Sequence, residues 1–253
     1  MKYKLGKLPP KIDSRTLKLA KYIDRSKLPA LLPAVNWSDA VSAEWGMMGN
    51  DSLGDCTCAA MGHIVMAITA NAGVMKTPSD AEVLAMYENI GGYKPGDEST
   101  DNGATELDAL NYMRASGLAG VKLDAFADIG QTDLGIVKMA IQLFGPIYIG
   151  VAIKKSDMAR FQAGLPWAIE PAEEDDPSNT VLGGHAIPVL DFDAASGTCV
   201  TWGKLQLFTW AWFLARCDEV HAALFFDWIS DLGTAPSGLD LKALEADLRA
   251  ICQ

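Results

Sequence analysis

The first half of the chain alternates polar loops with segments whose apolar residues recur every three to four positions. In the segment 78–89, a proline and a serine stand at the start, and apolar residues then follow at helical spacing. The segment 59–70 is apolar and ends at Asn71-Ala72-Gly73, a helix-stop signal. We predict helices over 59–70, 78–89, 105–116 and 132–143.

The second half is richer in β-branched and aromatic residues, and its apolar runs are short and bounded by turn residues. Gly145-Pro146 precedes one such run, and the turn 193–197 separates two others. We predict strands over 147–153, 185–192, 199–202, 207–213 and 222–228, and a long acidic loop over 164–184. Helices come first and strands second, which predicts the α+β class rather than an alternating βαβ plan.

The two ends of the chain have patterns of their own. Residues 1–35 are basic and rich in proline, with a short helix predicted over 14–25. They fit an arm that wraps the domain, or a short pro-segment that blocks a cleft. Residues 237–251 have an amphipathic helical pattern that Ser237 can cap.

Composition and charge limit the partners. The 253 residues are 49% hydrophobic, enough for a sizeable core, and carry a net charge of −11. Such an acidic surface repels phosphate backbones, so we expect no nucleic acid partner. No apolar run is long enough to span a membrane, and no secretory apolar segment follows the basic N-terminus. We expect a cytoplasmic protein; its oligomeric state stays open.

One cysteine has a setting that suits chemistry. The five cysteines lack the paired CxxC spacing of zinc sites, so we expect reduced thiols, no metal and no cofactor. The polar loop 50–58 carries Cys56 to the start of the first predicted helix. The helix dipole and the unpaired amides of a first turn favour the thiolate, which is the nucleophilic form.

A cysteine nucleophile needs a base, and the chain has 3 histidines. His63 lies two turns along the same predicted helix, roughly 10 Å from Cys56 and too far for a hydrogen bond. His221 has no flanking glycines, and we interpret it as structural or exposed. His185 follows Gly183-Gly184 at the start of an apolar strand, where glycines allow a close approach. His185 is therefore the candidate base.

The order of these features resembles that of the papain-like cysteine peptidases. The resemblance covers about residues 32–230 and depends on successive landmarks rather than on one motif. They are the mature N-terminus at 32–37, the active-site loop at 50–56, a glycine turn and helix at 101–112, the helix, Gly-Pro turn and strand at 137–151, the histidine strand at 184–187, the Trp-Gly pair of 200–203, and a following strand at 210–213.

The resemblance implies a two-lobe α+β fold, with a helical left lobe, an antiparallel β-sheet or barrel as the right lobe, and an active-site cleft between them. The implied division is an arm or short pro-segment over 1–35, a papain-like domain over 36–235 with lobes of about 36–128 and 129–235, and a C-terminal helix in 236–253. The chain would be a divergent member of bacterial or phage type without a long pro-region.

The resemblance also implies roles for individual residues. Cys56 would be the nucleophile and His185 the base, and the Asn50 amide would join the Cys56 backbone N–H in an oxyanion hole. The implied substrate-binding residues are Gly54, Asp55, Gly184 and Trp202.

Two departures from the family pattern affect this site. Thr57 replaces the tryptophan that normally follows the cysteine, and the asparagine that orients the imidazole is missing. Alignment on Trp202-Gly203 puts Val200 at the orienting position. The hydroxyl of Thr201 could accept a hydrogen bond from the imidazole, but only if the register of this strand shifts by one residue. Such a shift turns each side chain to the opposite face of the strand.

We therefore expect a papain-like thiol hydrolase, a cysteine peptidase that cleaves amide bonds of a peptide or protein through an acyl-enzyme. One alternative, favoured by Thr57 and Val200, is a catalytically weak or inactive papain-fold protein that binds a peptide or partner. Another is an acyl-transferase that uses the same Cys/His pair.

Overall fold

The structure is a computed structural model that describes residues 3–225, 242–243 and 246–247. Polar side chains fix the helix starts: Ser79 and Glu82 form a capping box, and Thr105 accepts a hydrogen bond from the backbone N–H of Asp108. The helices are α1 (Cys56–Asn71), α2 (Asp80–Gly91), α3 (Glu106–Ala115), α4 (Leu134–Phe144), α5 (Lys155–Gln162), α6 (Pro171–Glu174) and α7 (Trp210–Arg216), with 3-10 turns η1 (Leu19–Lys21), η2 (Trp37–Ala40) and η3 (Glu98–Thr100).

The strands of the described residues form one mixed sheet in the order β1-β3-β8-β4-β5-β6-β7, with β2 paired to β5. Only the pairing of β1 with β3 is parallel. The strands are β1 (Leu17–Lys18), β2 (Val35–Asn36), β3 (Ala125–Asp128), β4 (Ile147–Lys154), β5 (Val181–Phe192), β6 (Ser196–Thr201), β7 (Lys204–Thr209) and β8 (Cys217–Leu224).

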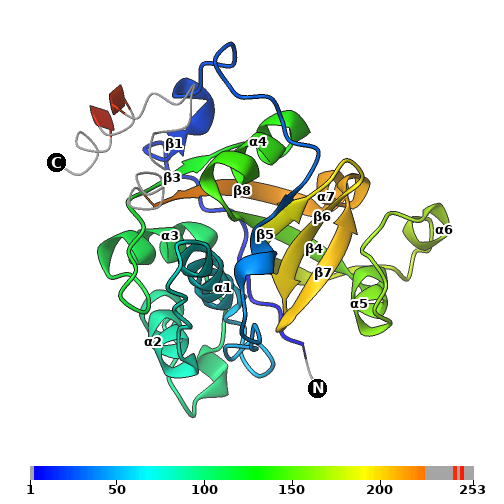
Figure 1. The fold of residues 1–253 in the computed structure, drawn as a ribbon. Coiled ribbons are helices and arrows are strands. Elements are labelled where there is room, and N and C mark those ends of the chain that lie inside the picture. The colour runs from blue at the N-terminus through cyan, green and yellow to red at the C-terminus, as the bar shows by residue number, and fades with distance from the viewer. Residues whose placement is uncertain (1–2, 226–241, 244–245, 248–253) are drawn as a thin grey trace.

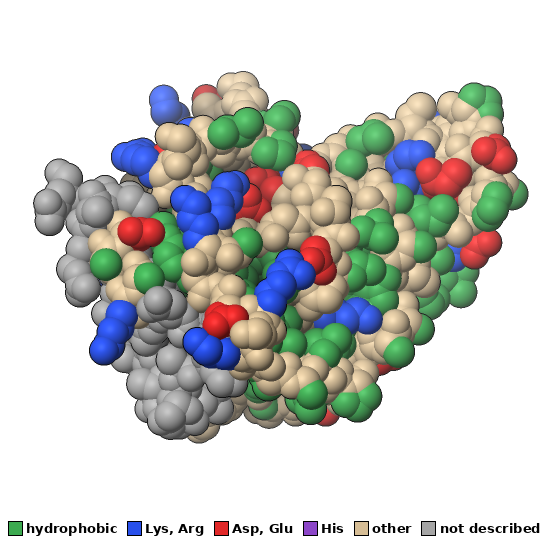
Figure 2. All heavy atoms as spheres, turned by 90° about the horizontal axis from the view of Figure 1, so that it is seen from above, with side chains coloured by type: hydrophobic (Ala, Val, Ile, Leu, Met, Phe, Trp, Pro, Cys, Tyr) green, Lys and Arg blue, Asp and Glu red, His purple; other side chains and the backbone are tan. Residues whose placement is uncertain are grey.

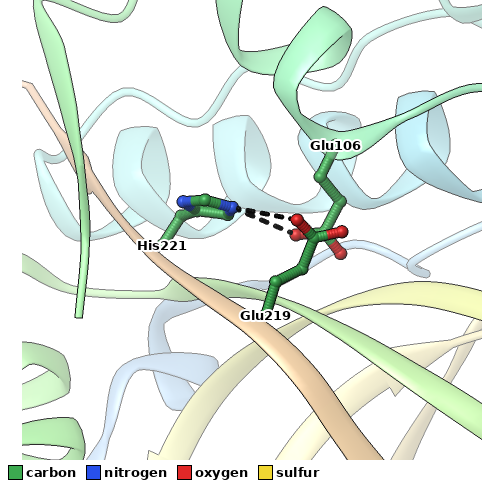
Figure 3. Close-up of side chains that lie close together, drawn as sticks. All are labelled: Glu106, Glu219 and His221. Carbon is green, nitrogen blue, oxygen red and sulfur yellow. Dashed lines mark hydrogen bonds and ion pairs between the residues drawn. The ribbon is translucent and has the colours of Figure 1, made fainter. Parts of the chain in front are cut away.

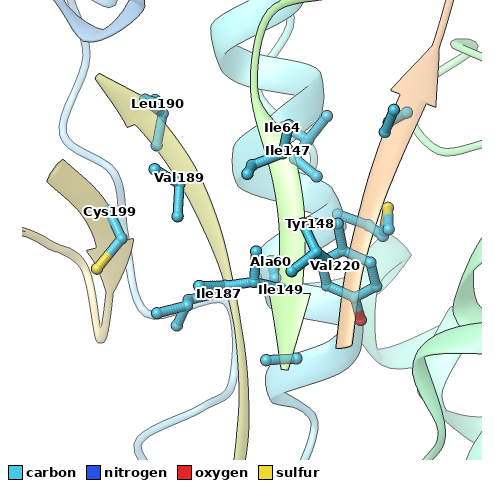
Figure 4. Packing of buried hydrophobic residues seen from close by; sticks show 14 of the residues in the cluster. Ala60, Ile64, Ile147, Tyr148, Ile149, Ile187, Val189, Leu190, Cys199 and Val220 are labelled. Carbon is cyan, nitrogen blue, oxygen red and sulfur yellow. The ribbon is translucent and has the colours of Figure 1, made fainter. Parts of the chain in front are cut away.

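Helices α1, α2 and α3 gather beside one end of the sheet, and α1 packs against β5 where the two parts meet (Figure 1). Every residue of α1 from Cys56 to Thr69 is buried, so this helix has no solvent face. Ala60 and Ile64 of α1 lie against Ile147 and Ile149 of β4 in the central core (Figure 4). This packing holds the start of α1 next to β5, which carries His185.

The N-terminal residues run between the helices and the sheet before they reach β1 (Figure 1, dark blue). We call residues 3–8 the cleft segment. Farther along, Lys18 pairs with Asp128, and Arg25 Nη2 lies 2.8 Å from Asp133 Oδ2. Basic and acidic side chains are accordingly mixed on the face seen from above (Figure 2). No helix of the described residues has the length and apolar character that a membrane span requires.

The α+β class with a papain-like two-lobe plan is confirmed, and each of the predicted helices over 59–70, 78–89, 105–116 and 132–143 corresponds to one of α1 to α4. The strand predicted over 207–213 is wrong in its second half: β7 ends at Thr209, whose hydroxyl accepts from the backbone N–H of Trp212 and starts α7. The helix predicted over 14–25 is also wrong, since only β1 and η1 form there.

Other differences are smaller. The predicted loop 164–184 contains α6 and the start of β5, and the strand predicted over 222–228 starts earlier, at Cys217. Strand β3 belongs to the sheet although it precedes residue 129. The predicted C-terminal helix over 237–251 lies almost entirely outside the described residues.

Candidate active site

Cys56 is the first residue of α1 and is 1% exposed. Burial raises the pKa of its thiol to about 12, while backbone groups of Ala186 and Gly6 act in the opposite direction. The helix N-terminus therefore does not produce a thiolate in this arrangement, which corrects the sequence-based expectation. The physical reason is that protein atoms cover the sulfur and exclude the water that would solvate its charge.

His185 lies in β5 and faces the same place. It is 1% exposed, and burial lowers the pKa of its imidazole to about 3, with a further contribution from His63. Cys56, His63 and His185 line one cavity of about 10 Å³, room for about one water molecule. The Nδ1 atom of His185 is buried and has no hydrogen-bond partner among the described residues. That atom is free to serve as the proton acceptor.

Thr201 makes the side-chain contact with His185 that an orienting residue would make. Its Oγ1 lies 2.8 Å from Nε2 of His185, and its side chain is buried. Thr201 pairs with Lys204, so Trp202 and Gly203 form a two-residue hairpin turn, and both have positive φ, 45° and 72°. The register irregularity lies in the β5–β6 pairing, between Val189 and Asp191, and Thr201 rather than Val200 bonds to His185. Val200 also lines the cavity but offers no hydrogen-bonding atom.

Trp202 covers the outer side of the imidazole. Its ring stacks on His185 with centroids 4.4 Å apart and an interplanar angle of 15°. Its indole Nε1 donates to the carbonyl oxygen of Lys4 at 3.1 Å. Trp202 therefore contacts both the candidate base and the cleft segment.

Asn50 lines the cavity, as a residue of the oxyanion hole would, but its Nδ2 donates to the Leu53 carbonyl at 3.0 Å. This bond holds the loop in a turn, and it directs one of the amide hydrogens away from the cavity. Asp55 is fully buried in front of α1, and burial raises the pKa of its carboxyl well above the usual range, against the effect of Asn50. Such burial suits support of the loop rather than contact with a substrate.

The predicted substrate-binding glycines, Gly54 and Gly184, contact the cleft segment. A side chain at Gly6 would meet the Gly54 carbonyl oxygen at 1.8 Å, and one at Gly184 would meet the Lys7 carbonyl oxygen at 2.4 Å. The Lys7 backbone N–H donates to Gly184 at 3.1 Å, and the Leu8 backbone N–H donates to Ala104 at 2.9 Å. The segment thus pairs with both lobes directly over Cys56.

A group of ionisable side chains, missed by the sequence analysis, lies beside the cleft segment. Glu106 starts α3, and Glu219 and His221 project from β8 toward it (Figure 3). These three offer ligand atoms within 4.8 Å of one another, which is a geometry that could hold a metal ion. The ammonium of Lys7 already lies 2.9 Å from Glu219 Oε1. His221 is buried, so of the two expected alternatives, structural or exposed, the exposed one is wrong.

No protein-family model and no curated protein matches this chain. Solved structures do match it. Xylellain, a cysteine protease from Xylella fastidiosa, superposes with a TM-score of 0.69 at 16% identity, covering 88% of this chain and 96% of its own. Digestive procathepsin L 3 of Tenebrio molitor larval midgut gives 0.60 at 12% identity, with 85% and 76% coverage. The cysteine protease CMS1MS2 of Carica candamarcensis gives 0.55 at 15% identity, with 76% and 98% coverage.

These likenesses establish the fold. The chain has the papain-like fold, and its neighbours in structure are papain-like cysteine proteases. The identities of 12–16% do not by themselves carry an activity or a residue's role to this chain.

Proposed function

We propose that this protein is a papain-like thiol hydrolase, a cysteine peptidase, that is held latent by its own N-terminal residues. The observation that carries the proposal is the shared cavity of Cys56 and His185, in which Thr201 binds Nε2 of the imidazole and leaves Nδ1 free. Nucleophile, base and orienting group are the set that acyl transfer by a thiol requires.

In the proposed reaction the Cys56 thiol gives its proton to Nδ1 of His185, and the sulfur attacks the carbonyl carbon of a peptide bond. The C–N bond breaks, the amine takes the proton from the imidazolium, and a thioester remains on Cys56. A water molecule, deprotonated by His185, then attacks the thioester, and the C–S bond breaks to release the acid. An amine in place of water would give the acyl-transferase alternative.

The backbone N–H of Cys56, at the start of α1, is the proposed donor to the oxyanion. Asn50 would join it only after its amide leaves the Leu53 carbonyl. Trp202 is the proposed shield of the imidazole, since its ring stacks on His185.

Residues 1–35 are proposed to act as a pro-segment rather than a passive arm. The cleft segment hydrogen-bonds to Gly184 and to Ala104, the places where a bound peptide would otherwise pair. It also buries Cys56, whose thiol pKa is about 12 in this state. We propose that release of the segment, by cleavage or displacement, lets water reach the pair and lowers that pKa.

The test uses the full chain with Gly6→Ala, because a methyl group at Gly6 collides with the Gly54 carbonyl and expels the segment. We expect this variant to cleave peptides in a mixed synthetic library, read by mass spectrometry, and the added substitutions Cys56→Ser or His185→Ala to abolish cleavage. Circular dichroism on each variant checks that the fold is kept. Gly135→Ala in α4, where an added methyl group meets a side-chain oxygen of Asp133 at 3.2 Å rather than a backbone atom, is the matched control.

The alternative of an inactive peptide-binding protein is favoured by one observation, the commitment of the Asn50 amide to Leu53. It predicts that folded Gly6→Ala protein binds peptides by isothermal titration calorimetry without cleaving any of them. That result would overturn the proposed hydrolase.

A further inference from the structure

The cleft segment places one charged side chain in the interior. Lys7 has a side-chain exposure of 1%, and its ammonium Nζ lies 3.0 Å from Asp218 Oδ2 and 2.9 Å from Glu219 Oε1. Burial disfavours the charge, but Glu106, Glu219 and Asp218 together raise the pKa of Lys7 above its usual value. Lys7 is therefore a buried cation held by carboxylates that come from outside its own segment.

The pocket that holds Lys7 is built from both lobes. Glu106 comes from the start of α3, and Asp218 and Glu219 come from β8. Gly150 of β4 forms the wall: a side chain there would meet Lys7 Cε at 2.0 Å, Asp218 Oδ1 at 2.5 Å and Glu106 Oε1 at 2.8 Å. Only a glycine at this position leaves space for a long side chain to enter from the cleft.

Glu106 can accept further hydrogen bonds. It is fully buried, and neither of its carboxylate oxygens has a hydrogen-bond partner within the part of the chain that the structure describes. The ion-pair contact of Glu106 is with His221, at 3.7 Å (Figure 3). A lysine of the cleft segment leaves these oxygens without a donor, whereas the fork of an arginine has more donors to offer.

The backbone around Lys7 is held as a peptide would be. Its N–H binds Gly184, the residue before the candidate base, and the preceding Gly6 lies against Cys56. A peptide that replaced the segment and used the same backbone partners would place one side chain where the Lys7 side chain now lies. The side chain of Lys7 therefore indicates which kind of substrate side chain the pocket accepts.

We propose that the pocket formed by Glu106, Asp218, Glu219 and Gly150 is a specificity pocket for a lysine or arginine side chain of the substrate. The proposal rests on the proposed function, which supplies the cleaved bond nearby. The charge distribution agrees with it: 9 of the 21 Lys and Arg residues, against two Asp, fall in residues 1–35, so a basic segment covers an acidic body.

The first experiment reads cleavage sites of the full-length Gly6→Ala chain in a synthetic peptide library of equal residue frequencies. We expect Lys and Arg to be enriched about tenfold at one fixed position within two residues of the cut, as charge-assisted hydrogen bonds predict. Adding Glu219→Gln should remove most of this enrichment. Enrichment of apolar residues at every position, or an enrichment that Glu219→Gln leaves unchanged, would overturn the proposal.

The second experiment does not depend on catalysis. In the full-length Lys7→Ala chain the pocket is empty, and n-butylammonium should raise the melting temperature, whereas n-butanol should not. Lys11→Ala, which removes an exposed lysine from its pair with Asp108, is the control and should not respond. An equal response to butanol, or a response only to Zn²⁺ or Mn²⁺, would contradict a pocket for an alkylammonium group.

The two experiments separate the two failures. If no peptide is cleaved but n-butylammonium stabilises Lys7→Ala, the hydrolase is wrong and the pocket is right. If peptides are cleaved without preference for a basic residue, the hydrolase is right and the pocket is wrong. The peptide library uses the Gly6→Ala chain and not Lys7→Ala. If Lys7→Ala does not fold, the library experiment can therefore still refute the proposed pocket.

Discussion

Nε2 of His185 and Oγ1 of Thr201 lie 2.8 Å apart, in a buried hydrogen bond between neighbouring strands β5 and β6. A threonine hydroxyl can both donate and accept, so this bond fixes the direction of the ring but selects a tautomer less strictly than a carbonyl oxygen would. The bond leaves the other ring nitrogen, Nδ1, without a partner among the described residues, and Nδ1 is the atom that we propose accepts the Cys56 proton.

We expect Thr201→Ala, in the Gly6→Ala background, to lower kcat about tenfold, which corresponds to the loss of one hydrogen bond of about 1.4 kcal/mol. Thr201→Ser keeps the hydroxyl and should retain most of the rate. Peptide turnover measured across pH 5–9 distinguishes a role in orienting the base from a loss of packing. Equal rates for the alanine and serine variants would show that the hydroxyl has no such role.

Alkylation should report how well the cleft segment covers the Cys56 thiol. In the unaltered chain the pKa of the Cys56 thiol is raised to about 12, so iodoacetamide at pH 7.5 should label it far more slowly than a free model thiol. Gly6→Ala should raise the rate at least tenfold, because the thiolate becomes solvated. Labelling of Cys56 is followed by peptide mass spectrometry, with Gly135→Ala as the unchanged comparison.

His63 should make the folded state sensitive to acid. Burial lowers the pKa of its imidazole to about 4, below the ordinary value of 6.5, while its Nε2 lies 3.1 Å from the Trp45 carbonyl. The unfolded chain therefore binds more protons between pH 6.5 and 4, and the contribution of neutral His63 to stability is lost as pH falls through that range.

The measurement is urea unfolding of the unaltered chain and of His63→Gln at pH 7 and pH 4. Relative to the variant, the unaltered chain should lose roughly 3 kcal/mol of unfolding free energy between these values. The comparison is necessary because Asp55 and Glu106, whose carboxyl pKa values are raised by burial, act in the opposite direction in both proteins. A constant difference between the two proteins would contradict the prediction.

Asp157 should be important for stability rather than for chemistry. Its carboxylate is fully buried and accepts from Trp212 Nε1 at 2.8 Å and from Arg216 Nε at 2.9 Å. Asp157→Ala removes the acceptor of Trp212 Nε1 and one of the two carboxylates that hold Arg216, and Glu174 remains, so we expect a loss of about 3 kcal/mol in urea unfolding. The double variant with Arg216→Ala should lose less than the sum of the two single variants, and simple additivity would count against a coupled pair.

Sequence patterns predicted the helices well because α1 to α4 are long and bounded by clear start and stop signals. The run at 207–213 was ambiguous, since a short apolar segment fits a strand or a helix, and the Thr209 cap decided the outcome. Thr201 rather than Val200 reaches His185, and the β5–β6 pairing has a register irregularity between Val189 and Asp191 that the sequence does not signal. A resemblance between landmarks cannot give such a register.

The pocket of Lys7 lay beyond the reach of the sequence for another reason. Lys7, Glu106 and Glu219 are far apart along the chain, and each alone has the pattern of an ordinary solvated charge. Their meeting depends on the packing of the cleft segment against both lobes, and on glycines where backbones touch, such as Gly6 against Gly54. The distribution of charged residues predicted a basic N-terminal arm and an acidic domain. It did not predict that Lys7 of the arm would contact Asp218 and Glu219 of the domain.

The pairing of the cleft segment with Gly184 and Ala104 links two properties that are usually adjusted separately. A segment that binds only the folded state stabilises that state by the free energy of its own binding, and because it is tethered its effective concentration is high. If the cleft segment is the inhibitor that we propose, latency and resistance to unfolding depend on the same binding free energy. A change that loosens the segment to give a faster enzyme should then also lower the free energy of unfolding.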